Sequence, residues 1–156
     1  MSTIPNRGFG DGPFGDWHFG EALPIFTPQI EPLETLFVTI GDDFYRNRQL
    51  VTNDGAAYDL VGSTLWFTVR KQLEKTDTSA LFKLYWEWDG ASDGITVENT
   101  DYGMAVIQLT PVQTATLEPG AYHYDLQIKD FGGLVHTIDH GVLVARRSAT
   151  MRTTTP

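Results

Sequence analysis

The sequence predicts an all-β sandwich, and three observations support this fold class. From Leu36 onward, apolar and polar residues alternate in short segments, the pattern of strands with one buried face. Clusters of glycine, asparagine and aspartate, which favour turns, separate these segments. The chain of 156 residues, 41% of them hydrophobic, suffices for a single core and leaves no room for a second domain of similar size.

The expected strands follow one another at short intervals. They span residues 36–40, 44–51, 65–70, 81–86, 95–97, 104–110, 122–129 and 134–145. The alternation of apolar and polar residues predicts a core that contains Leu65, Phe67, Val69, Ile107, Leu109, Tyr122, Tyr124 and Leu126. About eight strands at this spacing are typical of an immunoglobulin-like sandwich.

Two connections have recognisable signals. Residues 53–55, Asn-Asp-Gly, are the strongest hairpin signal in the chain. Residues 111–117 read as a single helical turn that crosses from one sheet to the other. The final strand, 134–145, is expected to bend at Gly141.

The composition changes sharply near Leu33. Five of the eight prolines and five of the fifteen glycines precede this residue, a density that opposes both helix and sheet. We therefore divide the chain into an extended arm over residues 1–32, a sandwich over 33–147 and a C-terminal tail over 148–156.

The arm is rich in aromatic residues, unlike most disordered segments. An aromatic residue followed by glycine recurs every five residues, and each ring can bury 150 Å² or more when it docks. We expect the arm to dock onto neighbouring subunits through Phe9, Phe14, Trp17, Phe19 and Phe26. The alternative is a flexible linker. The basic segment from Arg146 and Arg147 to Arg152, which runs from the end of the sandwich into the tail, is a candidate second strap onto the acidic body of a neighbour.

Charge and composition exclude several functions. The chain has 20 acidic and 11 basic residues and a net charge of −9, so its electrostatic field repels nucleic acid and anionic membranes. There is no cysteine, which excludes disulfides, thiolate metal sites and a cysteine nucleophile. The sequence contains neither a secretory signal nor a membrane-spanning apolar stretch.

The sandwich region resembles a family of phage proteins related to the N-terminal domain of the baseplate upper protein. The resemblance covers about 33–145 and rests on residues 41–44, 59–62, 67–70, 117–126, 133, 137 and 141–144. It implies an immunoglobulin-like virion component without catalytic residues, in the tail, baseplate, neck or capsid decoration of a tailed phage. Its expected partners are other virion proteins and copies of itself, and it would be synthesised in the cytoplasm of the bacterial host.

The segment Pro119-Gly120-Ala121-Tyr122 also looks like a tyrosine corner, in which Tyr122 enters a strand after an inter-sheet crossing. Two features differ from antibody domains. The paired cysteines are absent, and Trp66 is expected on the outer face. The sandwich architecture is expected without homology to antibodies.

No metal, cofactor or catalytic site is expected. His136 and His140 are four residues apart, but on a strand this spacing separates their Cα atoms by roughly 13 Å. His123 and Asp125 fall on a polar strand face, where such residues are ordinary. The loop 88–94 contains aspartates and glycines but lacks the acidic ladder of a known calcium loop. No serine occupies a hydrolase elbow.

A group of aromatic residues provides the alternative to a structural role. Trp66, Tyr85, Trp86 and Trp88 could stack on sugar rings, as in a carbohydrate-binding or receptor-binding module that contacts a host glycan. The simpler explanation is that two of these rings cap the core at the rim of the sheet.

Overall fold

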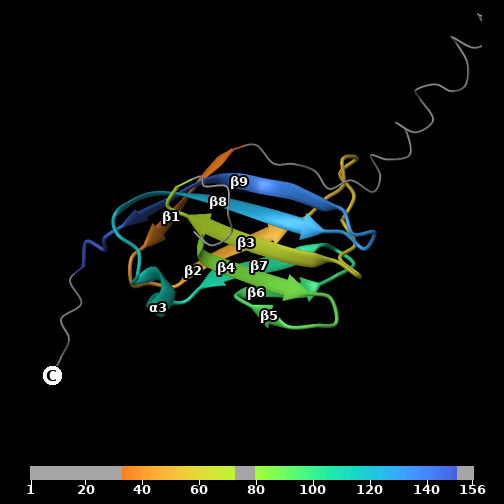
Figure 1. Cartoon of the computed structure of the whole chain (residues 1–156), viewed down its shortest axis with the longest axis horizontal. Coiled ribbons are helices and arrows are strands. Elements are labelled where there is room, and N and C mark those ends of the chain that lie inside the picture. The colour runs from red at the N-terminus through yellow and green to blue at the C-terminus, as the bar shows by residue number, and fades with distance from the viewer. Residues whose placement is uncertain (1–32, 73–79, 151–156) are drawn as a thin grey trace, which may run out of the picture.

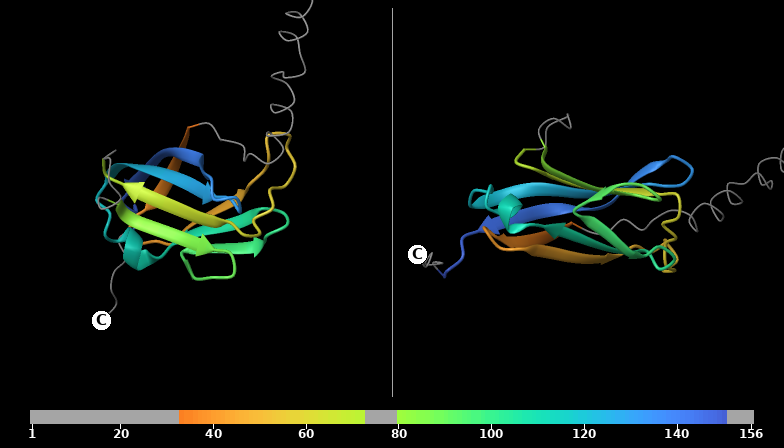
Figure 2. Two further views of the ribbon diagram at one scale, coloured as in Figure 1. Left: turned by 45° about the vertical axis from the view of Figure 1, so that its right-hand side comes forward. Right: turned by 90° about the horizontal axis from the view of Figure 1, so that it is seen from below.

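The computed structural model describes residues 33–72 and 80–150. They form a β-sandwich of two sheets, as the sequence predicts (Figures 1 and 2). The elements are β1 (Glu34–Thr39), β2 (Phe44–Gln49), β3 (Thr64–Arg70), β4 (Ala80–Glu87), β5 (Ser92–Asp93), β6 (Ile95–Asn99), β7 (Met104–Leu109), α3 (Pro111–Thr114), β8 (Gly120–Lys129) and β9 (Val135–Arg146).

The two sheets differ in size. The larger has the strand order β1-β9-β8-β3-β4-β5, and the smaller has the order β2-β7-β6. Neighbouring strands are antiparallel except β1 and β9, which run parallel with Glu34 beside Gly141 and Thr39 beside Arg146. Figure 2 shows the sheets as two layers facing each other. The chain therefore enters the described region through an edge strand of the larger sheet.

The core forms where the alternating residues face inward. All eight predicted core residues are buried, and Leu65, Leu109 and Leu126 are fully so. Leu65, Phe67 and Val69 of β3 lie beside Ile128, Leu126 and Tyr124 of β8. These residues pack in one cluster with Ile107 of β7, which belongs to the opposite sheet. The alternation in the sequence thus identifies the inner face of each strand correctly.

The predicted crossing between the sheets is also confirmed. The helical turn α3 leads from β7 of the smaller sheet to β8 of the larger one. Thr110 caps this turn, because its hydroxyl accepts a hydrogen bond from Gln113 and the Gln113 side chain accepts one from the Thr110 N–H. After the turn, the Tyr122 hydroxyl donates to the carbonyl of Glu118 and accepts from its N–H, both at 2.9 Å.

Two local expectations need refinement. The turn at 53–55 closes only a small hairpin with an isolated bridge between Val51 and Ala57, because β2 pairs with β7 instead. In β9, the register shift against β8 falls at Ile138, since Leu126 faces Asp139 and Gln127 faces Thr137. Gly141 has another role, which is to let β1 approach β9 closely. No helix in the described part of the chain is long and apolar enough to cross a membrane.

Candidate functional site

The predicted docking residues Phe9, Phe14, Trp17, Phe19 and Phe26 lie outside the described residues. The structure does describe the point where the arm joins the sandwich, which we call the arm root (Leu33 and β1). β1 lies in register with β9 over six residue pairs. Leu36 and Val38 point into the core, whereas Phe37 is exposed. The guanidinium of Arg146 lies over the Phe37 ring, 4.9 Å from its centroid. The arm root is therefore held by backbone pairing, by core packing and by a cation–π contact.

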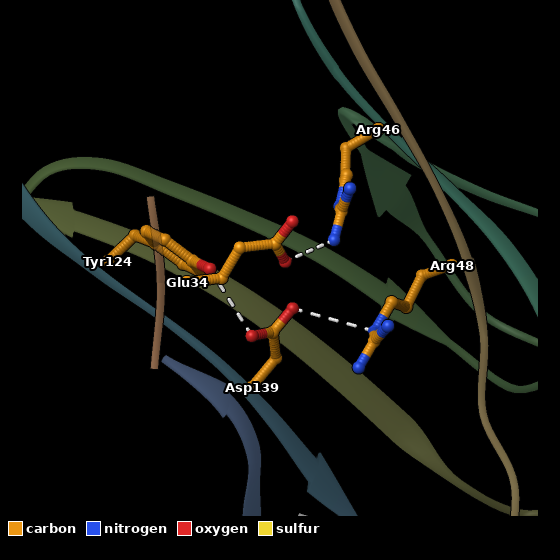
Figure 3. A network of polar contacts seen from close by, with 5 residues as sticks. All are labelled: Glu34, Arg46, Arg48, Tyr124 and Asp139. Atoms are coloured by element: carbon orange, nitrogen blue, oxygen red, sulfur yellow. Dashed lines mark hydrogen bonds and ion pairs between the residues drawn. The ribbon is translucent and has the colours of Figure 1, made fainter. Parts of the chain in front are cut away.

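Ionic contacts also tie the arm root to the smaller sheet (Figure 3). Arg46 of β2 forms an ion pair with Glu34, the first residue of β1. Arg46 and Arg48 alternate along β2 with the exposed residues Tyr45, Asn47 and Gln49, so both arginines face the larger sheet. This contact joins two strands that share no backbone hydrogen bonds, because they belong to different sheets.

The second arginine reaches a buried carboxylate. Nε of Arg48 lies 3.5 Å from Oδ2 of Asp139, and the Tyr124 hydroxyl donates to Oδ1 of Asp139 at 3.2 Å. Burial raises the pKa of Tyr124 above its ordinary value, and the nearby carboxylates of Asp139 and Glu34 raise it further. Two carboxylates of the larger sheet, one of them in the arm root, thus pair with two arginines of the smaller sheet.

The aromatic residues proposed for ligand stacking do not form one surface. Trp66 lies on the outer face of the larger sheet, beside Tyr85 on β4 and Gln127 on β8. Trp86 pairs with the fully buried Leu65 and packs against the core. Trp88 is 43% exposed and meets the edge of Trp86, with ring centroids 6.4 Å apart. Trp86 and Trp88 therefore cap the rim of the core, and only Trp66 and Tyr85 remain together on an outer face.

The three histidines in the described part of the chain lie on β8 (His123) and β9 (His136 and His140). Asp125 of β8 lies directly beside His140 of β9, and both line a hollow of about 420 Å³ with Arg70 and His123. His136 lies 3.3 Å from Asp130 instead. Among the described residues, no group of three or more histidine, aspartate or glutamate side chains is placed to hold a metal ion.

One end of the sandwich contains a pocket that the sequence does not predict. This loop-end pocket, of about 470 Å³, lies between the β2–β3 loop and the β8–β9 turn. Its lining includes Tyr58, Asp59, Val61, Asp130 and Phe131. Burial and the charges of Asp130 and Asp59 raise the pKa of Tyr58. The pocket therefore combines apolar walls with negative charge.

Three loops meet at this end. The N–H of Leu60 donates to the carbonyl of Thr100 at 3.0 Å, which joins the β2–β3 and β6–β7 loops. Gly62 packs against Phe131, because a methyl group on Gly62 would lie 3.0 Å from the Cβ of Phe131. The Phe131 side chain is nevertheless 85% exposed. The apolar Phe131 beside two glycines is a signal in the sequence, but only the fold brings it into one pocket with Asp59.

No protein-family model matches the chain, and no curated protein sequence matches it either.

Proposed function

We propose that the protein is a non-enzymatic structural component of a tailed-phage virion, in which the sandwich carries residues 1–32 as a docking arm. The observation that carries this proposal is the construction of the arm root. The arm leads into β1, an edge strand that is fixed to β9 by six register pairs and to β2 by the Glu34–Arg46 ion pair. Force on the arm would thus be transmitted to both sheets.

The form of the sandwich supports an immunoglobulin-like assignment. The Tyr122 hydroxyl makes hydrogen bonds to the N–H and the carbonyl of Glu118. This is the geometry of a tyrosine corner, in which the tyrosine hydroxyl forms a hydrogen bond with the backbone a few residues upstream. An immunoglobulin-like fold is what the resemblance to the phage family implies. The partners on this proposal are other virion proteins and further copies of the chain.

Incorporation into particles tests the proposal directly. Replacing Phe9, Phe14 or Phe19 by alanine in the full chain should weaken docking by about 2 kcal/mol each, as interface anchors commonly do. The triple variant should be lost from purified virions while its thermal melt is unchanged. Tyr45→Ala, which removes an exposed ring from β2, is the matched control and should enter particles normally. Full occupancy of the triple variant would contradict the proposal.

The second candidate is glycan binding, and the pair Trp66–Tyr85 favours it. The two rings occupy paired positions on the outer face of the larger sheet, and Gln127, whose amide nitrogen donates to Thr137, lies on the other side of Trp66. Calorimetry with oligosaccharides of the host surface would test this function. Binding that Trp66→Ala abolishes and Trp88→Ala leaves intact would support it, and the absence of binding would rule it out for the sugars tried.

A further inference from the structure

The loop-end pocket has the chemistry of an arginine-binding site. A guanidinium ion is planar and permanently charged, stacks on aromatic faces and pairs with carboxylates. The pocket offers the exposed ring of Phe131 together with the carboxylates of Asp59 and Asp130. The same chain already places an arginine on a phenylalanine at Phe37 and Arg146. An arginine side chain would therefore find in this pocket both kinds of contact that it favours.

The two carboxylates are held in place by the backbone. Oδ1 of Asp59 accepts a hydrogen bond of 2.9 Å from the N–H of Val61, and Oδ1 of Asp130 accepts one of 2.8 Å from the N–H of Leu134. His136 approaches the other oxygen of Asp130 at 3.3 Å. The hydrogen bonds from the backbone fix the direction of both carboxylates, so a cation can bind without reorganising the loops.

The charges of the two terminal segments distinguish between the possible occupants from this chain. Residues 1–32 contain Arg7 but also Asp11, Asp16, Glu21 and Glu31, so the arm is acidic and an acidic pocket repels it. Residues 147–156, which follow β9, contain Arg147 and Arg152 and no acidic side chain. Charge complementarity therefore favours the tail.

The position of the tail favours a second copy of the chain over the same one. The β8–β9 turn, which lines the pocket, leads directly into β9. The tail begins where β9 ends, on the opposite side of the sandwich (Figure 1). A strand of 12 residues separates the two points by roughly 36 Å. Residues 147–156 would have to run almost fully extended along the body to reach their own pocket, since ten residues span at most about 36 Å.

From these observations we infer that the loop-end pocket binds the arginine-bearing tail of a second copy, so that copies of the chain associate head to tail. Such a contact is heterologous, because the pocket of one copy meets the tail of the next. Repetition of the contact gives a ring or a filament. This inference goes beyond docking through the arm and does not depend on it.

Sedimentation of the full chain over a concentration series tests the association. We expect species larger than the monomer, with association that weakens as salt screens the charges. Asp59→Asn and Phe131→Ala should each raise the concentration needed for association about tenfold or more. Asp59→Asn keeps the oxygen that bonds Val61, and Phe131 is exposed, so both variants should fold. A chain that stays monomeric at every concentration would overturn the inference.

Matched controls at the same end of the sandwich separate the pocket from the surrounding loops. Asp101→Asn and Tyr102→Ala alter an acidic and an aromatic residue of the β6–β7 loop, outside the pocket lining. Both should associate like the unaltered chain. If they weaken association as much as the pocket variants do, the contact is not made in the pocket and the inference is wrong.

A mixing experiment tests the head-to-tail geometry. Phe131→Ala keeps the tail but loses the pocket, and a chain that ends at Arg147 keeps the pocket but loses most of the tail. At a concentration where the unaltered chain associates but each variant alone is still monomeric, their mixture should form a one-to-one complex that grows no further. A mixture that remains monomeric while the unaltered chain associates would show that another surface is used.

Peptide binding tests the choice of occupant. A labelled peptide of residues 145–156 should bind the unaltered chain and bind Asp59→Asn about tenfold more weakly. A peptide of residues 1–32 or a neutral oligosaccharide that displaces it would instead assign the pocket to the arm or to a glycan. Because the arm variants with alanine at Phe9, Phe14 and Phe19 should self-associate normally, failure here is distinguishable from failure of the proposed virion function.

Discussion

The Tyr124 hydroxyl donates a hydrogen bond of 3.2 Å to Oδ1 of Asp139, so a tyrosine of β8 orients a buried carboxylate of β9. The other oxygen of Asp139 faces Arg48 of the opposite sheet at 3.5 Å. The contact of Arg48 with Asp139 joins the two sheets. Glu34 and Arg46 extend the contact to the arm root.

Replacing Arg48 by methionine should destabilise the fold substantially. The substitution removes the cation that faces Asp139. The Asp139 carboxylate, whose side chain is only 4% exposed, is then left without a charged partner. Breaking a buried ion pair in this way costs about 3 to 5 kcal/mol, because an uncompensated charge remains. Urea denaturation of the variant measures this loss.

The matched control is Lys71→Met, which breaks the ion pair of Lys71 with Glu118. Both side chains of that pair are largely exposed, so its removal should change the free energy of unfolding by less than about 1 kcal/mol. An Arg48→Met variant as stable as this control would show that the network between the sheets contributes nothing to stability.

Alkaline pH should destabilise the fold through Tyr124. Its pKa is raised in the folded state, mainly by burial, above the value of 10.0 expected when the chain is unfolded. Between the two pKa values the folded protein binds more protons than the unfolded chain, so stability is fully present below pH 10.0 and falls as the pH rises above it. Thermal melts across this range measure the slope.

The variant Tyr124→Phe tests the assignment. It should show a shallower loss of stability above pH 10.0, because it lacks the shifted group. At neutral pH it should be less stable by about 1 to 3 kcal/mol, since Asp139 loses a donor. Tyr58 also has a raised pKa and should account for part of the slope that remains. An unchanged slope would exclude Tyr124 as the titrating group.

Much of the sandwich could be predicted because its signals are local. Alternation in β3 and β8 identifies the buried side of each strand, and the segment after α3 predicts the hydrogen bonds of Tyr122. Neither prediction requires knowledge of which strands pair. The parallel pairing of β1 with β9 carries no such signal, because the partners are more than one hundred residues apart.

The polar network and the loop-end pocket were missed for the same reason. Arg46 and Arg48 alternate with polar residues along β2, so nothing local indicates that they face the other sheet. Their partners Glu34 and Asp139 come from two strands of that sheet. The pocket likewise requires two loops that the fold, and not the nearby sequence, brings together. The split of the four stacking candidates follows from strand register, which places Trp66 and Trp86 on opposite faces.

The two hydrogen bonds of Tyr122 should contribute measurably to stability. Tyr122→Phe keeps the buried ring and removes only the hydroxyl that bridges to Glu118. We expect a loss of about 1 to 2 kcal/mol, since two backbone groups lose their partner. The control is Tyr45→Phe. The hydroxyl of Tyr45 is exposed, and the hydrogen bond that it accepts from Gln108 competes with hydrogen bonds to water. Equal stability of the two variants in urea denaturation would contradict a structural role for the corner.

The arm root links folding to the proposed function, and its close packing depends on Gly141. A methyl group on Gly141 would overlap the carbonyl oxygen of Glu34 and lie 2.9 Å from its carbonyl carbon. Backbone atoms cannot rotate away as a side chain can, so Gly141→Ala should displace the start of β1 from β9 and weaken the Glu34–Arg46 ion pair. We expect a loss of about 1 to 3 kcal/mol, as overpacking usually causes.

The control for Gly141→Ala is Gly132→Ala, where the nearest atom is a side-chain oxygen of Asp130 at 3.3 Å, so that a small shift suffices and no backbone atom is overlapped. Amide hydrogen exchange should show faster exchange in β1 of the Gly141→Ala variant, while the interior strands β3 and β8 remain protected. If the arm functions only when its root is fixed, this variant should also enter virions less well than its loss of stability explains. Normal incorporation despite rapid exchange in β1 would show that the arm docks independently of its anchor, and the rigid arm root would then have no part in assembly.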